Sequence, residues 1–227
     1  MWQALHEELA PRGLEVVTVA LDTDPEAARP WIEAARPQHP SLIDRGHILD
    51  ALFGIVNVPS GVWIDERGTI VRPPETAYPR RPEFLDRKVS ADATPRERTH
   101  VAALHRLRVD SESYVAALRD WVEYGAASRY ALSPEEVLRR SRPRPVAVAT
   151  AAAHFALGQH LHDAGQGEAA IPHFREAQRL HPDNWTYKRQ AWALLGPDRS
   201  SVDVYGADWL SEAERIGVEN YYPPVDL

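Results

Sequence analysis

The chain has 227 residues and no cysteine, and 44% of its residues are hydrophobic and 26% are charged. This composition is typical of a globular protein, and the length suggests one large domain or two small ones. The lack of cysteine excludes disulfides, cysteine-ligated zinc and thiol chemistry performed by these residues alone. The formal net charge of -7 argues against general binding of nucleic acids or anionic membranes, which requires surplus cations.

No apolar segment reaches the roughly 18 residues of a membrane span, and the first twelve residues mix Glu and His among the apolar positions. We therefore expect no membrane span and no secretory leader. As written the chain is expected to be cytoplasmic, with the compartment left open if an export segment precedes it.

Residues 2–72 mix helical and strand-like patterns. Trp2, Leu5 and Leu9 share one helical face, and Asp24 followed by Pro25 is typical of a helix start. The predicted elements are a helix that begins at or before Met1, a strand over 14–21 buried on both faces, a helix over about 25–35, a short helix over 43–53, and a hairpin of 61–65 and 69–72. This order belongs to an α/β layer architecture.

The second half reads as mainly helical. Segment 73–109 is rich in Pro and Arg and is expected to be a long connection with a helix near 95–107. Further helices are predicted over 111–124, after a capping box of Ser133 and Glu136, over 184–195 and over 209–216. Arg139, Arg140, Arg142 and Arg144 alternate with Ser and Pro, and we interpret them as an exposed hinge because Pro143 and Pro145 break both helix and strand.

From residue 151 onward, eight residues match the spacing of a 34-residue tetratricopeptide repeat. They are Leu157, Gly158, Leu161, Gly165, Ala170, Phe174, Ala177 and Pro182. Small residues fit where two antiparallel helices touch, a glycine fits the turn, and Phe174 fills the seam. One such unit cannot bury its own face and needs neighbours, which the helix over 184–195 and a cap over 209–216 would supply. Stacked helix pairs present a concave face, so we expect a protein or peptide partner on this helical part.

A second pattern lies before the predicted hairpin. Residues 53–60 read Phe-Gly-Ile-Val-Asn-Val-Pro-Ser, and the strand Val-Trp-Ile-Asp at 62–65 and Gly68 follow. With the rest of residues 13–73, this stretch resembles the thioredoxin-like fold, in particular its TlpA/ResA-like, peroxiredoxin-related branch. The resemblance implies a cis peptide before Pro59, a substrate groove lined by Val58, Pro59 and Ser60, and core positions at Trp63 and Ile64. The alternative is that Pro59 merely opens a strand.

In that family a Cys-x-x-Cys motif begins the first helix, directly after a strand. Met1 already lies inside the predicted first helix, so the resemblance places the redox motif and its strand upstream of residue 1. The expected fold is therefore an α/β thioredoxin-like fold, incomplete at its N-terminus, plus an all-α tetratricopeptide-like helical domain. One branch of similar proteins has selenocysteine in the motif, encoded by UGA, which would explain a start at an internal Met. Alternatively, a rearrangement or a partner's strand fills the position, leaving a redox-dead binding module or a strand-sharing homo-oligomer.

The predicted organisation is a thioredoxin-like domain over 1–125, a hinge over 126–144 and a helical domain over 145–227. We expect no catalytic residue, metal site or cofactor in the chain. His154, His160 and His162 are not at i, i+4 spacing and read as solvated side chains, and Asp24 is explained as a helix cap. The function expected is a thiol or selenol disulfide oxidoreductase or peroxidase, inactive in this form. The alternative is a non-catalytic protein-interaction module.

Overall fold

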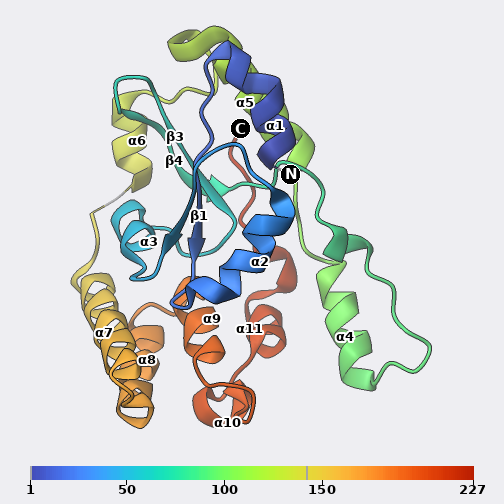
Figure 1. The fold of residues 1–227 in the computed structure, drawn as a ribbon, viewed down its shortest axis with the longest axis vertical. Helices are drawn as coiled ribbons and strands as arrows, with labels where there is room; N and C mark the ends of the chain where they lie inside the picture. The colour runs from blue at the N-terminus through green and yellow to red at the C-terminus, as the bar shows by residue number, and fades with distance from the viewer. Residues whose placement is uncertain (1, 142) are drawn as a thin grey trace.

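The computed structural model describes residues 2–141 and 143–227, so Met1 and Arg142 lie outside the described residues. Short strands occupy the middle of the molecule, α1 and α5 lie at one end, and α7 to α11 lie at the other (Figure 1). The strands are β1 (Thr18–Leu21), β2 (Ser41–Asp44), β3 (Ser60–Ile64) and β4 (Ile70–Thr76). The helices are α1 (Trp2–Leu9), α2 (Pro25–Ala35), α3 (Ile48–Phe53), α4 (Pro95–Leu104), α5 (Ser111–Tyr124), α6 (Pro134–Ser141), α7 (Val146–Asp163), α8 (Gly167–Leu180), α9 (Trp185–Ala193), α10 (Ser201–Tyr205) and α11 (Trp209–Ile216). The chain is thus a mixed α/β protein, mainly helical and with small sheets.

The strands form two separate pairs. β1 runs parallel to β2, with Thr18 opposite Ser41, and β3 runs antiparallel to β4, with Ser60 opposite Thr76. The second pair contains register shifts around Trp63. Within the described ranges no backbone pairing joins one pair to the other. The fold therefore lacks a continuous sheet across these four strands.

Local capping explains where several helices begin. The Asp24 side chain accepts a hydrogen bond from the Glu26 amide, and Pro25 takes the first position of α2, where an amide hydrogen is not needed. Thr94 and Glu97 form a complete capping box on α4. The predicted helices over 2–9, 25–35, 111–124 and 209–216 are confirmed. No helix of the described part is both long and apolar enough to cross a membrane.

Three details of the predicted α/β part are wrong. The expected helix over 43–53 is instead β2 followed by α3, which begins only at Ile48. The expected strand over 14–21 is shortened to β1, and Val17 directly before it is 53% exposed. All four residues of β1 are only half-buried, and β1 has a neighbour on one edge only within the described residues. Trp63 is buried as expected, but Ile64 is exposed because successive side chains of a strand point to opposite faces.

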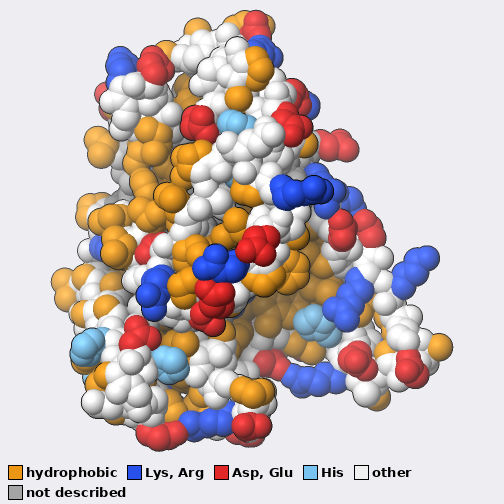
Figure 2. Space-filling model, in the orientation of Figure 1, with side chains coloured by type: hydrophobic (Ala, Val, Ile, Leu, Met, Phe, Trp, Pro, Cys, Tyr) orange, Lys and Arg blue, Asp and Glu red, His pale blue; other side chains and the backbone are white. Residues whose placement is uncertain are grey.

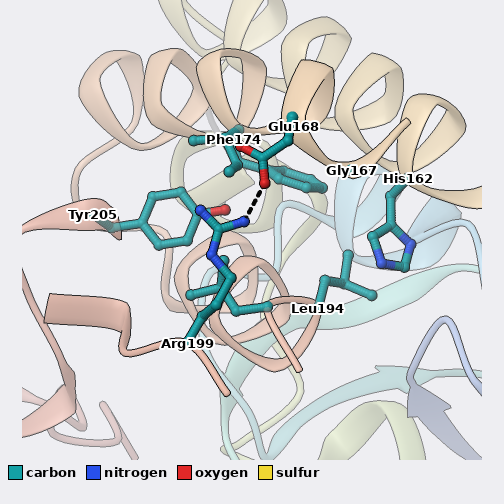
Figure 3. A pocket seen from close by; sticks show the side chains of 9 residues that line it. His162, Gly167, Glu168, Phe174, Leu194, Arg199 and Tyr205 are labelled. Atoms are coloured by element: carbon teal, nitrogen blue, oxygen red, sulfur yellow. Dashed lines mark hydrogen bonds and ion pairs between the residues drawn. The ribbon is translucent and has the colours of Figure 1, made fainter. Parts of the chain in front are cut away.

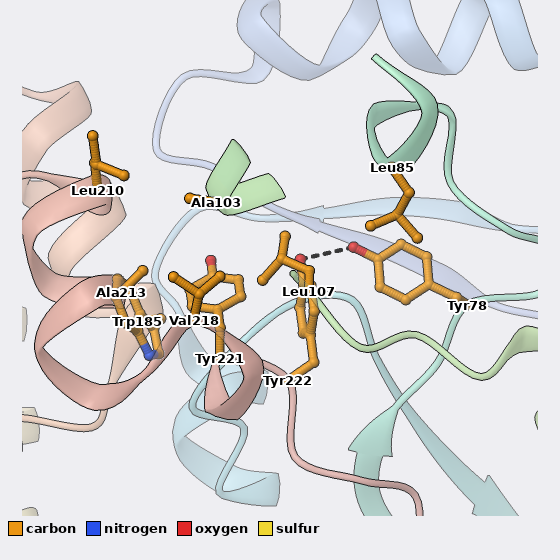
Figure 4. Close-up of a cluster of buried hydrophobic side chains, with 10 residues drawn as sticks. All are labelled: Tyr78, Leu85, Ala103, Leu107, Trp185, Leu210, Ala213, Val218, Tyr221 and Tyr222. Carbon is orange, nitrogen blue, oxygen red and sulfur yellow. Dashed lines mark hydrogen bonds between the residues drawn. The ribbon is translucent and has the colours of Figure 1, made fainter. Parts of the chain in front are cut away.

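Two hydrophobic clusters hold this architecture together. The first packs α1 and α5 against the β3–β4 hairpin, and its members are Leu5, Leu9, Trp63, Ala77, Tyr114, Val115, Ala117 and Leu118. The second joins the segment after β4 to α9, α11 and the C-terminal tail, and Figure 4 shows its side chains around Tyr221 and Tyr222. In this cluster the Tyr78 hydroxyl donates to the Tyr222 hydroxyl at 2.7 Å. Segment 73–109, expected to be a connection, and the predicted domain over 145–227 therefore share one core.

Helices α7 and α8 form an antiparallel hairpin with its own cluster. Ala170 and Ala177 are buried at the contact, and the Phe174 ring lies against Gly158, where an added Cβ would be 2.7 Å from the ring. Gly165 adopts a φ of +74° in the turn. Leu161 is half-buried and packs on this cluster, but Leu157, 42% exposed, and Pro182 face solvent. Six of the eight spaced residues therefore take part in the hairpin, and two lie outside its seam.

Candidate functional site

The stretch with the most specific sequence pattern is the loop between α3 and β3. Gly54 ends α3 with a φ of +76°, and the Ile55 amide donates to the Asp50 carbonyl at 2.8 Å. The Val58–Pro59 peptide bond is cis, as the resemblance implies. Val58, Pro59 and Ser60 are half-buried at the start of β3, and the Pro59 carbonyl accepts from the Ala77 amide at 3.1 Å.

This loop is fastened to the C-terminal half of the chain. The Val56 carbonyl accepts from the Trp185 amide at 2.6 Å, at the beginning of α9. The buried Asn57 side chain donates to the Tyr221 carbonyl and accepts from the Val58 amide, both at 2.9 Å. The Val58 N–H, which the resemblance would offer to a substrate, is therefore occupied within the chain. Within the described residues, no hydrogen bond reaches the Val58 carbonyl.

Beside this loop lies a buried polar network that sequence reasoning missed. His47 and Asp50, at the start of α3, are 4% and 1% exposed, and His47 Nδ1 lies 3.0 Å from Asp50 Oδ2. The other ring nitrogen lies 3.2 Å from Gln190 Oε1, and Gln190 Nε2 donates to Thr23 Oγ1 at 2.9 Å. Thr186 Oγ1 donates to Asp50 Oδ2 at 2.8 Å. The network thus connects α3 and the β1–α2 loop with α9.

The His47–Asp50 pair has the orientation of a base and its orienting carboxylate, but its surroundings do not suit catalysis. The ring is buried, its second nitrogen is already bonded to Gln190, and it packs edge-on against Phe155 of α7. A substrate would have to displace α9 to reach it. Asp50 Oδ1 is buried without a hydrogen-bond partner among the described residues. We therefore assign this network to holding the two halves together. The sequence offers no local pattern for this network, because His47 adopts a φ of +53° and its partner Gln190 lies 143 residues away.

A recess opens at the other end of the helical part (Figure 3). Ile171 and Phe174 of α8 and Leu194 form its apolar surface, and Arg199 pairs with Glu168 across it. Burial raises the pKa of Tyr205, whose ring forms one wall, to about 12.

The displayed surface carries both signs of charge, and no large single-sign area dominates it (Figure 2). Hydrophobic side chains gather over α2 and α3 on this face, where Trp31, Ile48 and Leu52 are exposed. Among the described residues no cluster of three or more His, Asp and Glu residues could hold a metal ion. His160 is exposed and His162 partly so, but His154 lies against His173 of α8.

Comparison of the chain with known protein families, with curated proteins and with solved structures finds no match.

Proposed function

We propose that this chain is the partner-binding portion of a ResA/TlpA-like thiol or selenol disulfide oxidoreductase or peroxidase, whose redox motif is not contained in the 227 residues. The observation that carries the proposal is the division of the strands into a parallel pair and an antiparallel pair. In the family that the 53–65 stretch resembles, one further strand lies between the equivalents of β1 and β3 and leads into the redox motif.

The backbone of β1 supports this reading. The Thr18 amide donates to the Pro40 carbonyl at 3.0 Å, so Thr18 and Ala20 turn their peptide groups toward β2. Val19 and Leu21 consequently turn theirs to the opposite edge, where no partner lies within the described part of the chain. An unpaired strand edge is a template for another strand. A strand placed there would also cover apolar side chains that a parallel sheet normally buries on both faces.

The helical part supports the second element of the proposal, which is the binding of a partner. The α7–α8 hairpin, with six of eight spaced residues in its contact, supports a tetratricopeptide-like unit that recruits a protein or peptide partner. Its next helix, α9, is bonded to the Val56 carbonyl directly before the 58–60 loop. A partner held by the helices would therefore lie close to the groove proposed at Val58, Pro59 and Ser60.

The first test measures amide hydrogen exchange in the 227-residue chain and in a form extended by the residues encoded upstream of Met1. We expect the Val19 and Leu21 amides to exchange rapidly in the first form and to be protected in the second. Thr18 and Ala20 are matched controls, because their amides face β2 in both forms. Protection of Val19 and Leu21 in the 227-residue chain, or a lack of any change on extension, contradicts the proposal.

The second test measures reduction of insulin disulfides and of hydrogen peroxide. We expect the 227-residue chain to be inert and the extended form to be active, with activity lost when the redox residue of the added segment is replaced by serine. If the extended form protects the Val19 and Leu21 amides but stays inert, the added strand pairs with β1 while the redox activity is absent.

That outcome would favour the alternative, a non-catalytic interaction module. The observation that supports this alternative is the hydrogen bond from the Val58 amide to Asn57 Oδ1, which occupies a group that the family offers to its substrate. In this case the Val19 and Leu21 amides would become protected by an added strand without any reductase or peroxidase activity.

A further inference from the structure

The helical hairpin places two imidazole rings against each other. His154 of α7 and His173 of α8 are half-buried, and their Nδ1 atoms lie 3.0 Å apart. The rings are stacked, with centroids 5.3 Å apart and an interplanar angle of 28°. The sequence contains no local pattern for this pair, because the two residues lie 19 positions apart on different helices.

We propose that His154 and His173 form an exchangeable binding site for a divalent transition-metal ion of the Zn²⁺ or Cu²⁺ type. Imidazole is a preferred ligand of both ions. Since the described residues contain no group of three or more ligands, water completes the coordination shell. The site is therefore weaker than a structural zinc site with four protein ligands.

The observed separation fits two nitrogen ligands of one ion. Two imidazoles bound to tetrahedral zinc at 2.0–2.1 Å have nitrogen atoms about 3.3–3.4 Å apart. Neighbouring nitrogen ligands of square-planar copper at about 2.0 Å are about 2.8 Å apart. The separation of 3.0 Å lies between these values. In the metal-free chain the two Nδ1 atoms are hydrogen-bonded to each other. A bound ion would replace the shared proton, after rotation of the rings about their Cβ–Cγ bonds points both lone pairs at the ion.

A carboxylate lies near the pair on the same helix. Glu176 follows His173 by one turn of α8, and it pairs with Arg179 at 2.6 Å. The hairpin contact also fixes the backbone of both ligands, because Phe174, next to His173, is buried against Gly158. A bound ion would cross-link α7 to α8 and stabilise the hairpin.

The test is calorimetric titration of the 227-residue chain, carrying no histidine tag, with ZnCl₂ in a buffer that does not bind zinc. We expect one equivalent to bind with a Kd in the micromolar range and to raise the thermal unfolding temperature. H154N and H173N should each weaken binding at least about tenfold, because each removes a direct ligand. The double variant H160N/H162N is the matched control, since these residues lie on the same helix outside the pair, and it should bind as the unmodified chain does.

Copper provides a readout that a purely structural role of the two histidines would not change. One equivalent of Cu²⁺ should give an electron paramagnetic resonance spectrum that shows coupling to two nitrogen nuclei. In H154N or H173N the spectrum should show coupling to one nitrogen nucleus. E176Q should weaken zinc binding by a smaller factor while leaving both nitrogens on copper. The proposal is overturned if zinc shows no saturable binding, or if it binds H154N and H173N as tightly as the unmodified chain.

Discussion

The close approach of Gly158 to Phe174 allows a quantitative test of the helical hairpin. A Cβ at position 158 would lie 2.7 and 2.8 Å from two carbons of the Phe174 ring. The ring is 2% exposed and also packs against Phe155, so it has little room to move. Gly158→Ala therefore has two opposing effects, a gain in helix propensity and a clash in the seam.

We expect the cost of the clash to exceed the gain in helix propensity. Replacing glycine by alanine inside a helix stabilises it by about 1 kcal/mol. Overpacking a well-packed core costs typically about 1–3 kcal/mol. We expect a net destabilisation of about 1 kcal/mol, which for a protein of this size lowers the unfolding temperature by roughly 2–4 °C.

A double-mutant cycle in urea isolates the contact. Phe174→Leu alone should cost roughly 1–2 kcal/mol because it leaves a cavity. In that background Gly158→Ala should become neutral or stabilising, which gives a coupling energy of about 1–2 kcal/mol. Gly167→Ala is the control, since Gly167 begins α8 with nothing within 4 Å of the added Cβ, and it should be neutral or slightly stabilising. Additive effects of the two substitutions would refute the packing argument.

Two further predictions concern buried polar groups. Asp50→Ala leaves His47 Nδ1 buried without its carboxylate partner, while Thr186 keeps Asn184 as an acceptor. It should lower the free energy of urea unfolding by about 3 kcal/mol, whereas a loss under about 1 kcal/mol would mean that the carboxylate is not needed to satisfy His47. Burial raises the pKa of Tyr187 to about 12, so the folded protein retains its phenol proton where the unfolded chain, with a pKa near 10, releases it. The contribution of Tyr187 to the free energy of unfolding, on the order of 2 kcal/mol, is present below pH 10 and is lost as the pH rises toward 12. In the same urea assay the free energy of unfolding of Tyr187→Phe should fall less between pH 9 and 11.5 than that of the unmodified chain.

Helices could be predicted from the sequence because their signals are local. Asp24 and Pro25 mark the start of α2 within two positions, and the apolar spacing of 111–124 reproduces α5. The hairpin of α7 and α8 also follows from a pattern within 34 residues, in which Gly158 and Ala170 are small because the helices touch there. Each of these signals depends on neighbours within a few turns of the chain.

Strand limits and buried polar groups were less predictable because their causes are distant in the sequence. The run over 14–21 is apolar enough for a strand buried on both faces, yet its actual exposure depends on whether a second neighbour pairs with it. Likewise, His47 is buried only because Gln190 and Phe155 approach it from the helical half. Contacts of this kind connect positions more than 100 residues apart and leave no periodicity to read.

The same long-range contacts bear on the expected division into domains. A hinge between two independent domains would leave each with its own core, but Trp185 and Tyr221 pack with Tyr78 and Leu85 in one cluster. In addition, Asn57 and Val56 bond to the tail and to α9, so the 58–60 loop is positioned by residues from the far end of the chain. A partner that binds the helices and shifts α9 would therefore act directly on the backbone before Pro59, so recruitment by the helical part and support of that loop would be coupled.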